Sequence, residues 1–334
     1  MTYPPKKLSV GMRLVLAILG VVVLGALSAL AVGAWGVKYY NAAGPAEQET
    51  TVIIPKGTGF AGITAMLADA DVVDHPLAFR VVAEVLKKTD HLKAGEYAFP
   101  AHASPREVLS LMVDGKTVMH RLTVPEGLTT KQVLKIITTE EKLEGNMPTN
   151  VEEGTLLPET YMFTRGDSRS SMVERMRRSM RELLRELWET RQENLPLSNP
   201  EEALILASIV EKETGIDAEY GLVASVFINR LNLGMPLQAD PTVIYAVTNG
   251  EENLGRLLTR TDLRLDSPYN TYVVNGLPPT PIANPGRKAL EAVLNPPETD
   301  YIFFAATGKG GHNFAVTLEE HNRNVRAFRR VLRQ

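Results

Sequence analysis

The chain contains no cysteine, which excludes disulfide bonds, thiol nucleophiles and cysteine-ligated metals. Its 334 residues carry a formal net charge of only −3, which argues against a nucleic-acid-binding protein, because such proteins normally present a basic face. Neither a Gly-x-Ser-x-Gly elbow nor a His-Glu-x-x-His motif occurs, and the six histidines are scattered. We therefore expect no metal site, no other cofactor and no nucleic-acid partner.

The chain has one long apolar run, Leu14 to Ala34, which is about the length that crosses a bilayer as a helix. Basic residues precede this run and aromatic residues follow it: Lys6, Lys7 and Arg13 before, and Trp35, Tyr39 and Tyr40 after. The pattern predicts a cytoplasmic tail over residues 1–13 and a retained inner-membrane helix over 14–36, with the rest outside the cytoplasm. A cleaved signal peptide is the alternative, because Ala29-Leu30-Ala31 fits a small-residue cleavage site.

A short linker is expected over residues 37–50, and beyond it two segments repeat one pattern. These are VIIPKGTGFAGITAML at 52–67 and LTVPEGLTTKQVLKII at 122–137. Each predicts a strand, a Pro-x-Gly turn and a helix. Between the two copies we expect helices over 76–88 and 104–113 and a strand over 94–99. The result is a small α/β module over 51–120 that resembles the LysM carbohydrate-binding module, with a plain spacer domain as the alternative.

The segment Ala203 to Thr214 predicts a nearly continuous apolar helix that begins at Asn199-Pro200 and ends on carboxylates. Helical spacing places Glu211 over the apolar stripe formed by Leu204, Ala207 and Ser208, and turns Glu213 away from that stripe. Apolar surroundings favour the protonated form of a carboxyl group, as a general acid requires. The alternative is that Glu211 is solvated at a frayed helix end.

Three later segments are rich in the tyrosine, asparagine, glutamine, threonine and aspartate side chains that stack on sugar rings and bind hydroxyl or acetamido groups. They are LQADPTVIY at 237–245, SPYNTY at 267–272 and GLPPTPIANPG at 276–286. The residues that we predict to bind substrate are Gln238, Asp240, Thr242, Tyr245, Tyr269, Asn270, Tyr272 and Asn284. Alternatively, the prolines and glycines of these segments only mark turns, and Asp240, before Pro241, caps one of them.

The motifs ASIVEKET, VFINRL, LQADPTVIYA, SPYNTY, GLPPTPIANPG and HNFAVTLEEHN, in this order, resemble the YceG-like family, the endolytic murein transglycosylases. EGTLLPETYMF at 153–163 is also similar to a family element, with Leu157 and Glu159 as departures. The resemblance covers the chain from about residue 50 to its end, and the N-terminal anchor. It implies a LysM-like module followed by a mixed α+β catalytic domain over 121–334, with Glu211 as the catalytic acid and base.

The activity that the resemblance implies is cleavage of the bond between N-acetylmuramic acid and N-acetylglucosamine in peptidoglycan. One group protonates the glycosidic oxygen and then, as a carboxylate, removes the proton of the sugar's own C6 hydroxyl, which leaves a 1,6-anhydro end. Such a lyase would terminate or trim nascent glycan strands, with peptidoglycan synthases as nearby partners.

Two other interpretations remain open at this point. A muramidase would hydrolyse the same bond with two carboxylates, Glu211 and Asp240. A non-catalytic anchor would bind the wall only through the LysM-like module.

Overall fold

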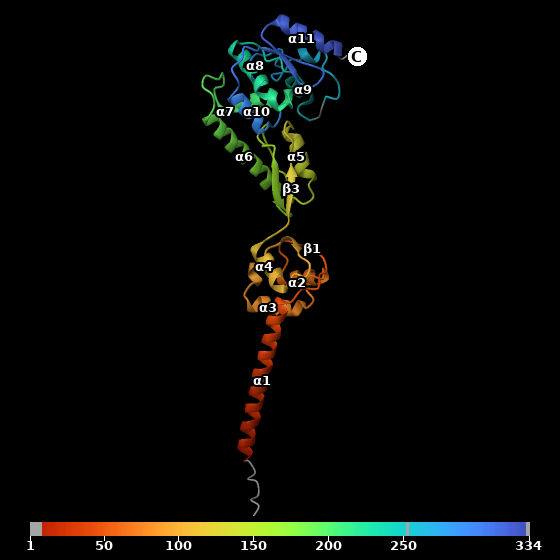
Figure 1. Ribbon diagram of the computed structural model, residues 1–334, viewed down its shortest axis with the longest axis vertical. Helices are drawn as coiled ribbons and strands as arrows, with labels where there is room; N and C mark the ends of the chain where they lie inside the picture. The colour runs from red at the N-terminus through yellow and green to blue at the C-terminus, as the bar shows by residue number, and fades with distance from the viewer. Residues whose placement is uncertain (1–8, 252–253, 332–334) are drawn as a thin grey trace, which may run out of the picture. The chain divides into compact units, whose positions relative to one another are not determined.

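The computed structural model describes residues 9–251 and 254–331 and has a mixed α+β fold (Figure 1). The chain divides into two compact units, residues 1–119 and 120–334. The basic residues Lys6 and Lys7, which precede the apolar run in the sequence, lie outside the described residues.

The first unit begins with helix α1, Val10–Asn41, whose apolar part is long enough to cross a membrane and is not buried in the protein. The helix is longer than the predicted span, because it continues through residues 37–41 and buries Tyr39. The residues that follow α1 pack on the module. The Gly44 amide donates to the His102 carbonyl, and the His102 amide donates to the Ala46 carbonyl. The segment predicted as a short linker, 37–50, thus contains the end of α1 and residues that bond to the module.

The rest of the first unit follows a strand–helix–helix–strand order. Its elements are β1 (Thr50–Ile54), α2 (Phe60–Asp69), α3 (Pro76–Val85), the 3₁₀ turn η1 (Thr89–His91), β2 (Gly95–Phe99) and α4 (Pro105–Asp114). Strands β1 and β2 form an antiparallel pair that places Val52 opposite Tyr97. The fully buried rings of Phe79, Tyr97 and Phe99 form the centre of this core. The order of elements agrees with the predicted module, whereas the likeness to LysM stays a prediction.

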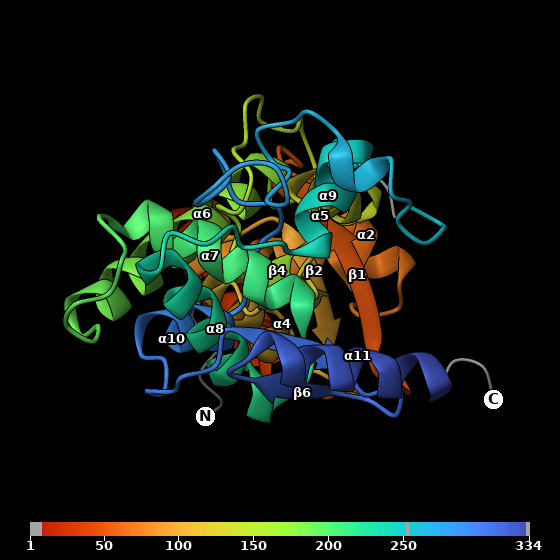
Figure 2. The same ribbon diagram turned by 90° about the horizontal axis from the view of Figure 1, so that it is seen from above.

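The second unit contains the remaining elements. These are β3 (Met119–Thr123), α5 (Thr130–Thr139), β4 (Thr160–Thr164), α6 (Arg169–Glu189), α7 (Pro200–Glu213), η2 (Asp217–Glu219), α8 (Tyr220–Asn232), α9 (Asp240–Thr248), η3 (Asp262–Arg264), α10 (Arg287–Leu294), β5 (Phe303–Ala306), β6 (His312–Ala315) and α11 (Leu318–Val331). Strand β3 pairs with β4, and β5 pairs with β6 in an antiparallel hairpin that lies along α11 (Figure 2).

Both copies of the repeated pattern fold as a strand, a turn and a helix. Gly57 and Gly127 have φ angles of 81° and 74°, a left-handed conformation that glycine adopts without strain. The second helix, α5, starts with a capping box in which Thr129 and Gln132 satisfy each other's backbone amides. The same turn carries Glu126 out of β3, which places an acidic side chain before a helix.

Helix α7 lies in the main core of the second unit, packed against α6, α8 and α10 (Figures 1 and 2). Eight consecutive residues of this helix, Ala203 to Val210, are buried, because it is covered on several sides rather than along one stripe. Asn199 caps its first turn by accepting a hydrogen bond from the Glu202 amide at 2.8 Å, as the sequence predicts. The last turn leaves the core and carries Glu211 and Glu213 to the edge of the packed region.

Candidate active site

Glu211 lies on the last turn of α7 and is half-buried. Both of its carboxyl oxygens accept hydrogen bonds: Oε1 from the Tyr220 hydroxyl at 3.0 Å and Oε2 from the Gly286 amide at 2.9 Å. Tyr220 begins α8 and Gly286 precedes α10, so three elements of the core hold this side chain in place. The alternative of a solvated, frayed helix end is not what the structure shows.

A second carboxylate lies against the same glycine. A Cβ atom added to Gly286 would overlap the carboxyl group of Glu126, so Gly286 contacts Glu126 as well as Glu211. The Glu126 side chain is exposed, and its charge also acts on Tyr220 and Lys288. The candidate site therefore contains two acidic groups that both lie against Gly286.

The surroundings of Glu211 act on its proton in opposite directions. Burial raises the pKa of Glu211 above its usual range, and the negative charge of Glu126 adds to that effect. The hydrogen bonds from Gly286 and Tyr220 and the positive charge of Lys212 lower it. A group that first donates a proton and then accepts one needs both its protonated form and its ionised form to be stabilised.

Hydrogen bonds of Gly127 and Asn284 hold the loop that carries Glu126 in place. The Gly127 amide donates to the Asn284 carbonyl at 3.0 Å, and Lys212 Nζ donates to the Gly127 carbonyl at the same distance. The buried Asn284 side chain accepts from the Leu156 amide at 2.8 Å and donates to the Leu128 carbonyl at 2.9 Å. Asn284, predicted to bind sugar, has its amide group occupied by the protein, which indicates a positioning role.

Glu213 belongs to a second polar cluster. Helical spacing predicts that Glu213 is turned away from the apolar stripe that carries Glu211, but it does not predict burial by other elements. Burial and the nearby charge of Asp240 raise the pKa of Glu213 to about 8. The charge of Arg230 opposes this rise. Asp240 does not cap a turn, as one alternative expected; it starts α9 and accepts a short hydrogen bond of 2.6 Å from the Tyr272 hydroxyl.

The buried Arg230 connects the cluster to the predicted segments. It donates to the backbone carbonyls of Leu237 and Ile302 at 2.8 and 2.7 Å and to Gln238 Oε1 at 3.3 Å. The exposed Gln238 adopts a left-handed backbone conformation with φ of 53°, which L-residues seldom do. Asp240, Tyr272 and Gln238 thus lie together around Arg230 and Glu213.

Tyr245 and Tyr269 form a third group. Their rings lie 4.9 Å apart, and the Tyr269 hydroxyl shares a 2.7 Å hydrogen bond with Thr280 of the proline-rich loop. The Tyr245 hydroxyl donates to Glu153 at 3.4 Å, and burial raises the pKa of that glutamate. The same loop reaches α7, where the Ile282 amide donates to Ser208 Oγ at 3.0 Å, one turn before Glu211.

The remaining two predicted residues are fully buried. Thr242 bonds to the Ala239 carbonyl and to Thr271, and Asn270 donates to the carbonyls of Leu263 and Leu265. Like Asn284, these side chains hold loops together, and the structure leaves them no open face toward a sugar.

The sequence analysis missed Glu126, Tyr220 and Gly286. The repeat around Pro125 and Gly127 is the one signal that could have drawn attention to Glu126, because a charged residue stands at the turn in both copies. Among the described residues, no group of three or more histidine, aspartate or glutamate side chains is arranged to hold a metal ion.

Comparison with known proteins assigns the chain to a family. Residues 52–327 match the model of the YceG-like family. The endolytic murein transglycosylase of Bacillus subtilis is 32% identical over 312 residues, covering 83% of this chain and 84% of that protein. The Streptococcus pneumoniae protein of the same name is 30% identical over 323 residues, and the chain spans 57% of its length.

A solved structure gives the same assignment. The crystal structure of a yceG-like protein from Listeria monocytogenes aligns with 83% of this chain and 99% of its own, at a TM-score of 0.51 and 32% identity. These matches show that the chain belongs to the YceG-like family, and the curated relatives it matches are named endolytic murein transglycosylases.

Proposed function

We propose that this protein is a membrane-anchored lytic transglycosylase that cuts peptidoglycan strands internally between N-acetylmuramic acid and N-acetylglucosamine, with Glu211 as the single acid and base. The names of its relatives support the substrate class. The observation that carries the mechanism is the environment of Glu211, whose two oxygens are each held by one donor while burial favours the protonated carboxyl.

In this mechanism protonated Glu211 donates its proton to the glycosidic oxygen as the bond breaks. The carboxylate that results is stabilised by Tyr220 and Gly286, whose hydrogen bonds strengthen when their acceptor becomes charged. It then removes the proton of the C6 hydroxyl as that oxygen attacks C1, which leaves a 1,6-anhydro end and restores protonated Glu211. No water is consumed in this sequence.

We propose that substrate contacts come from the exposed or half-buried members of the predicted set: Gln238, Asp240, Tyr245, Tyr269 and Tyr272. The buried Thr242, Asn270 and Asn284 shape the loops that carry these contacts. Helix α1 would anchor the protein with its N-terminus in the cytoplasm, and the module of the first unit would help to bind the glycan.

A muramidase is the second candidate, because Glu126 provides a carboxylate beside Glu211. A hydrolase needs this second group to activate water or to form a covalent intermediate. A lyase does not need it, because the substrate's own hydroxyl attacks.

Product analysis separates the two. Purified glycan strands are digested with the full-length protein, and the new ends are weighed by mass spectrometry, where an anhydro end is one water lighter than a reducing end. We expect anhydro ends from the wild-type protein and from Glu126→Gln. Reducing ends from the wild type, together with loss of cleavage in Glu126→Gln, would instead identify a muramidase.

A further inference from the structure

Helix α3 of the first unit presents an apolar stripe to solvent. Leu77, Val81 and Val85 recur every four residues on one face and are 74%, 59% and 75% exposed. The opposite face of the helix carries Phe79 and Ala83, which are fully buried in the core of the module. The helix is therefore apolar on both sides, which the packing of the module alone does not explain.

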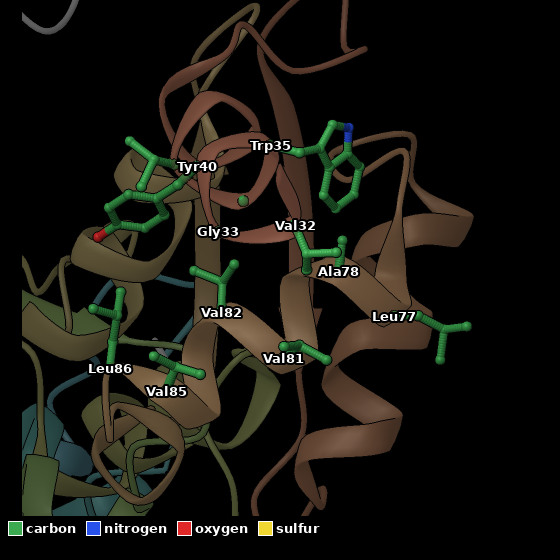
Figure 3. A pocket seen from close by; sticks show the side chains of 12 residues that line it. Val32, Gly33, Trp35, Tyr40, Leu77, Ala78, Val81, Val82, Val85 and Leu86 are labelled. Carbon is green, nitrogen blue, oxygen red and sulfur yellow. The ribbon is translucent and has the colours of Figure 1, made fainter. Parts of the chain in front are cut away.

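The stripe continues into helix α1. A pocket of about 590 Å³ lies between the two helices, with Val32 and Trp35 of α1 on one side and Val81 and Val82 of α3 on the other (Figure 3). None of the described residues that line it is charged. A sugar-binding pocket would need hydrogen-bond donors and acceptors, so this surface does not suit glycan.

The position of the pocket along α1 indicates what covers it. Val32 and Gly33 belong to the apolar run that ends at Ala34, and they line the same pocket as α3. Tyr39, one turn beyond Trp35, donates a hydrogen bond of 3.2 Å to the His75 carbonyl, directly before α3 begins. Helix α3 therefore lies at the level where the apolar run ends, which is where a spanning helix meets the headgroup region.

Positive charge borders the apolar surface. Lys88 and Arg106 line a smaller adjoining pocket that shares Tyr40 with the first one, and Asp114 is its one acidic residue. Lys87 and Lys38 are also exposed at the ends of α3 and α1. An apolar surface edged by lysine and arginine matches a phospholipid, whose acyl chains adjoin a phosphate.

We propose that the apolar stripe of α3 and the pocket beside α1 bind the acyl chains of the membrane that α1 spans. The module is then a peripheral membrane domain, held on the outer leaflet by α3, rather than a body tethered above it. This inference rests on the proposed anchor and goes beyond it, because a spanning helix by itself does not require the module to touch lipid.

The absence of native cysteine allows a direct test. Single variants Val81→Cys and Val85→Cys of the full-length protein are labelled with a nitroxide and reconstituted in vesicles of phosphatidylethanolamine and phosphatidylglycerol. Collision rates are measured with oxygen, which concentrates in lipid, and with a water-soluble nickel chelate. Leu24→Cys in the apolar run is the lipid reference, and Thr51→Cys on the exposed face of β1 is the water reference.

We expect labels at 81 and 85 to collide with oxygen more often than the Thr51 label does, though less often than the Leu24 label near the bilayer centre, and to be several-fold less accessible to nickel than the Thr51 label. Accessibility to nickel equal to that of Thr51 would overturn the inference while leaving the anchor intact. Protection from both reagents would also overturn it, because it would mean that a protein surface, such as a second copy, covers the stripe. A Leu24 label exposed to nickel would refute the anchor itself, and the inference with it.

Discussion

At Glu211, two hydrogen-bond donors and one neighbouring carboxylate act on the same proton. Replacing Glu211 by Gln nearly keeps the shape of the side chain but removes the carboxyl group whose oxygens accept from Tyr220 and Gly286, and with it the proton to be transferred. We expect cleavage of purified glycan to fall by about 10²–10⁴-fold or more, the usual loss when general acid–base catalysis is removed.

The matched control is Glu201→Gln, an exposed glutamate in the first turn of the same helix, which should cleave at the wild-type rate. Circular dichroism should show both variants folded. A folded Glu211→Gln protein that cuts strands at a near wild-type rate would remove the basis of the proposed mechanism.

The charge of Glu126 should be visible in the pH dependence of cleavage. The charged and titratable groups around Glu211 are Glu126, Lys212, Tyr220, Lys288 and Asp217. Glu126 raises the pKa of Glu211, so Glu126→Gln lowers it. Because the general acid must be protonated, the alkaline limb of the pH–rate profile, where activity falls, should move to lower pH than in the wild type.

The exposed Lys288 provides the control of opposite sign. Its positive charge interacts with both Glu126 and Glu211, so Lys288→Gln should move the same limb of the pH–rate profile to higher pH. Shifts in the same direction for both variants would show that charge is not the cause.

The place of Glu211 at the end of a buried helix could be predicted from the sequence, because the signals for it lie within that helix: the cap at Asn199, the apolar run and the carboxylate at its end. Its neighbours Glu126 and Gly286 could not be predicted, because they lie far from Glu211 along the chain. Gly286 is 75 residues away, and the turn that carries Glu126 is 85 residues away, the separation between Lys212 and Gly127. Only the tertiary fold brings them together, and a single sequence contains no local signal of that contact.

At the scale of elements, local chemistry also decides which predictions hold. The predicted helix starts at residue 104 and at Asn199 agree with the structure, because Ser104 and Asn199 each accept a hydrogen bond from an amide in the first turn of their own helix. The environment of Glu213 depends instead on where α8 and α9 place Arg230 and Asp240. Helical periodicity describes the faces of one helix and does not predict which residues of other helices pack against them.

The raised pKa of Glu213 implies a stability that depends on pH. Its carboxyl group keeps its proton up to about pH 8 in the folded protein, whereas its usual pKa is 4.5. Between these values the folded state binds more protons than the unfolded state, so the contribution of Glu213 to stability is present below pH 4.5 and is lost as the pH rises toward 8. Glu213→Gln should therefore raise the melting temperature at pH 8 more than at pH 5.

Thermal unfolding of both proteins at the two pH values measures this difference. The exposed Glu201→Gln again serves as the control and should leave the pH dependence unchanged. An equal change at pH 5 and pH 8 would mean that Glu213 is ionised in the folded protein.

Asn284 should act through the fold rather than through the sugar. Asn284→Ala leaves the buried Leu156 amide without its acceptor, and we expect a loss of about 1–3 kcal/mol in the free energy of unfolding. Denaturant titration measures it, with the exposed Asn275→Ala as the control. Unchanged stability combined with weaker glycan binding would restore Asn284 as a substrate contact.

At the scale of the whole molecule, the second unit holds every side chain proposed for the chemistry. A chain starting at residue 120 should fold and cleave glycan at high substrate concentration, and less efficiently at low concentration, because the module and anchor are absent. The same truncation with Glu211→Gln is the blank. A folded truncation without any cleavage would show that the first unit contributes to the reaction itself.

The continuity of α1 has a mechanical consequence. One helix of 32 residues contains both the apolar run and the buried Tyr39 of the module, so the module turns when the helix inclines. Spanning helices incline less in thicker bilayers. Bilayer thickness would then influence the orientation of the module. Because lipid composition sets that thickness, it would change the angle at which the module meets the cell wall.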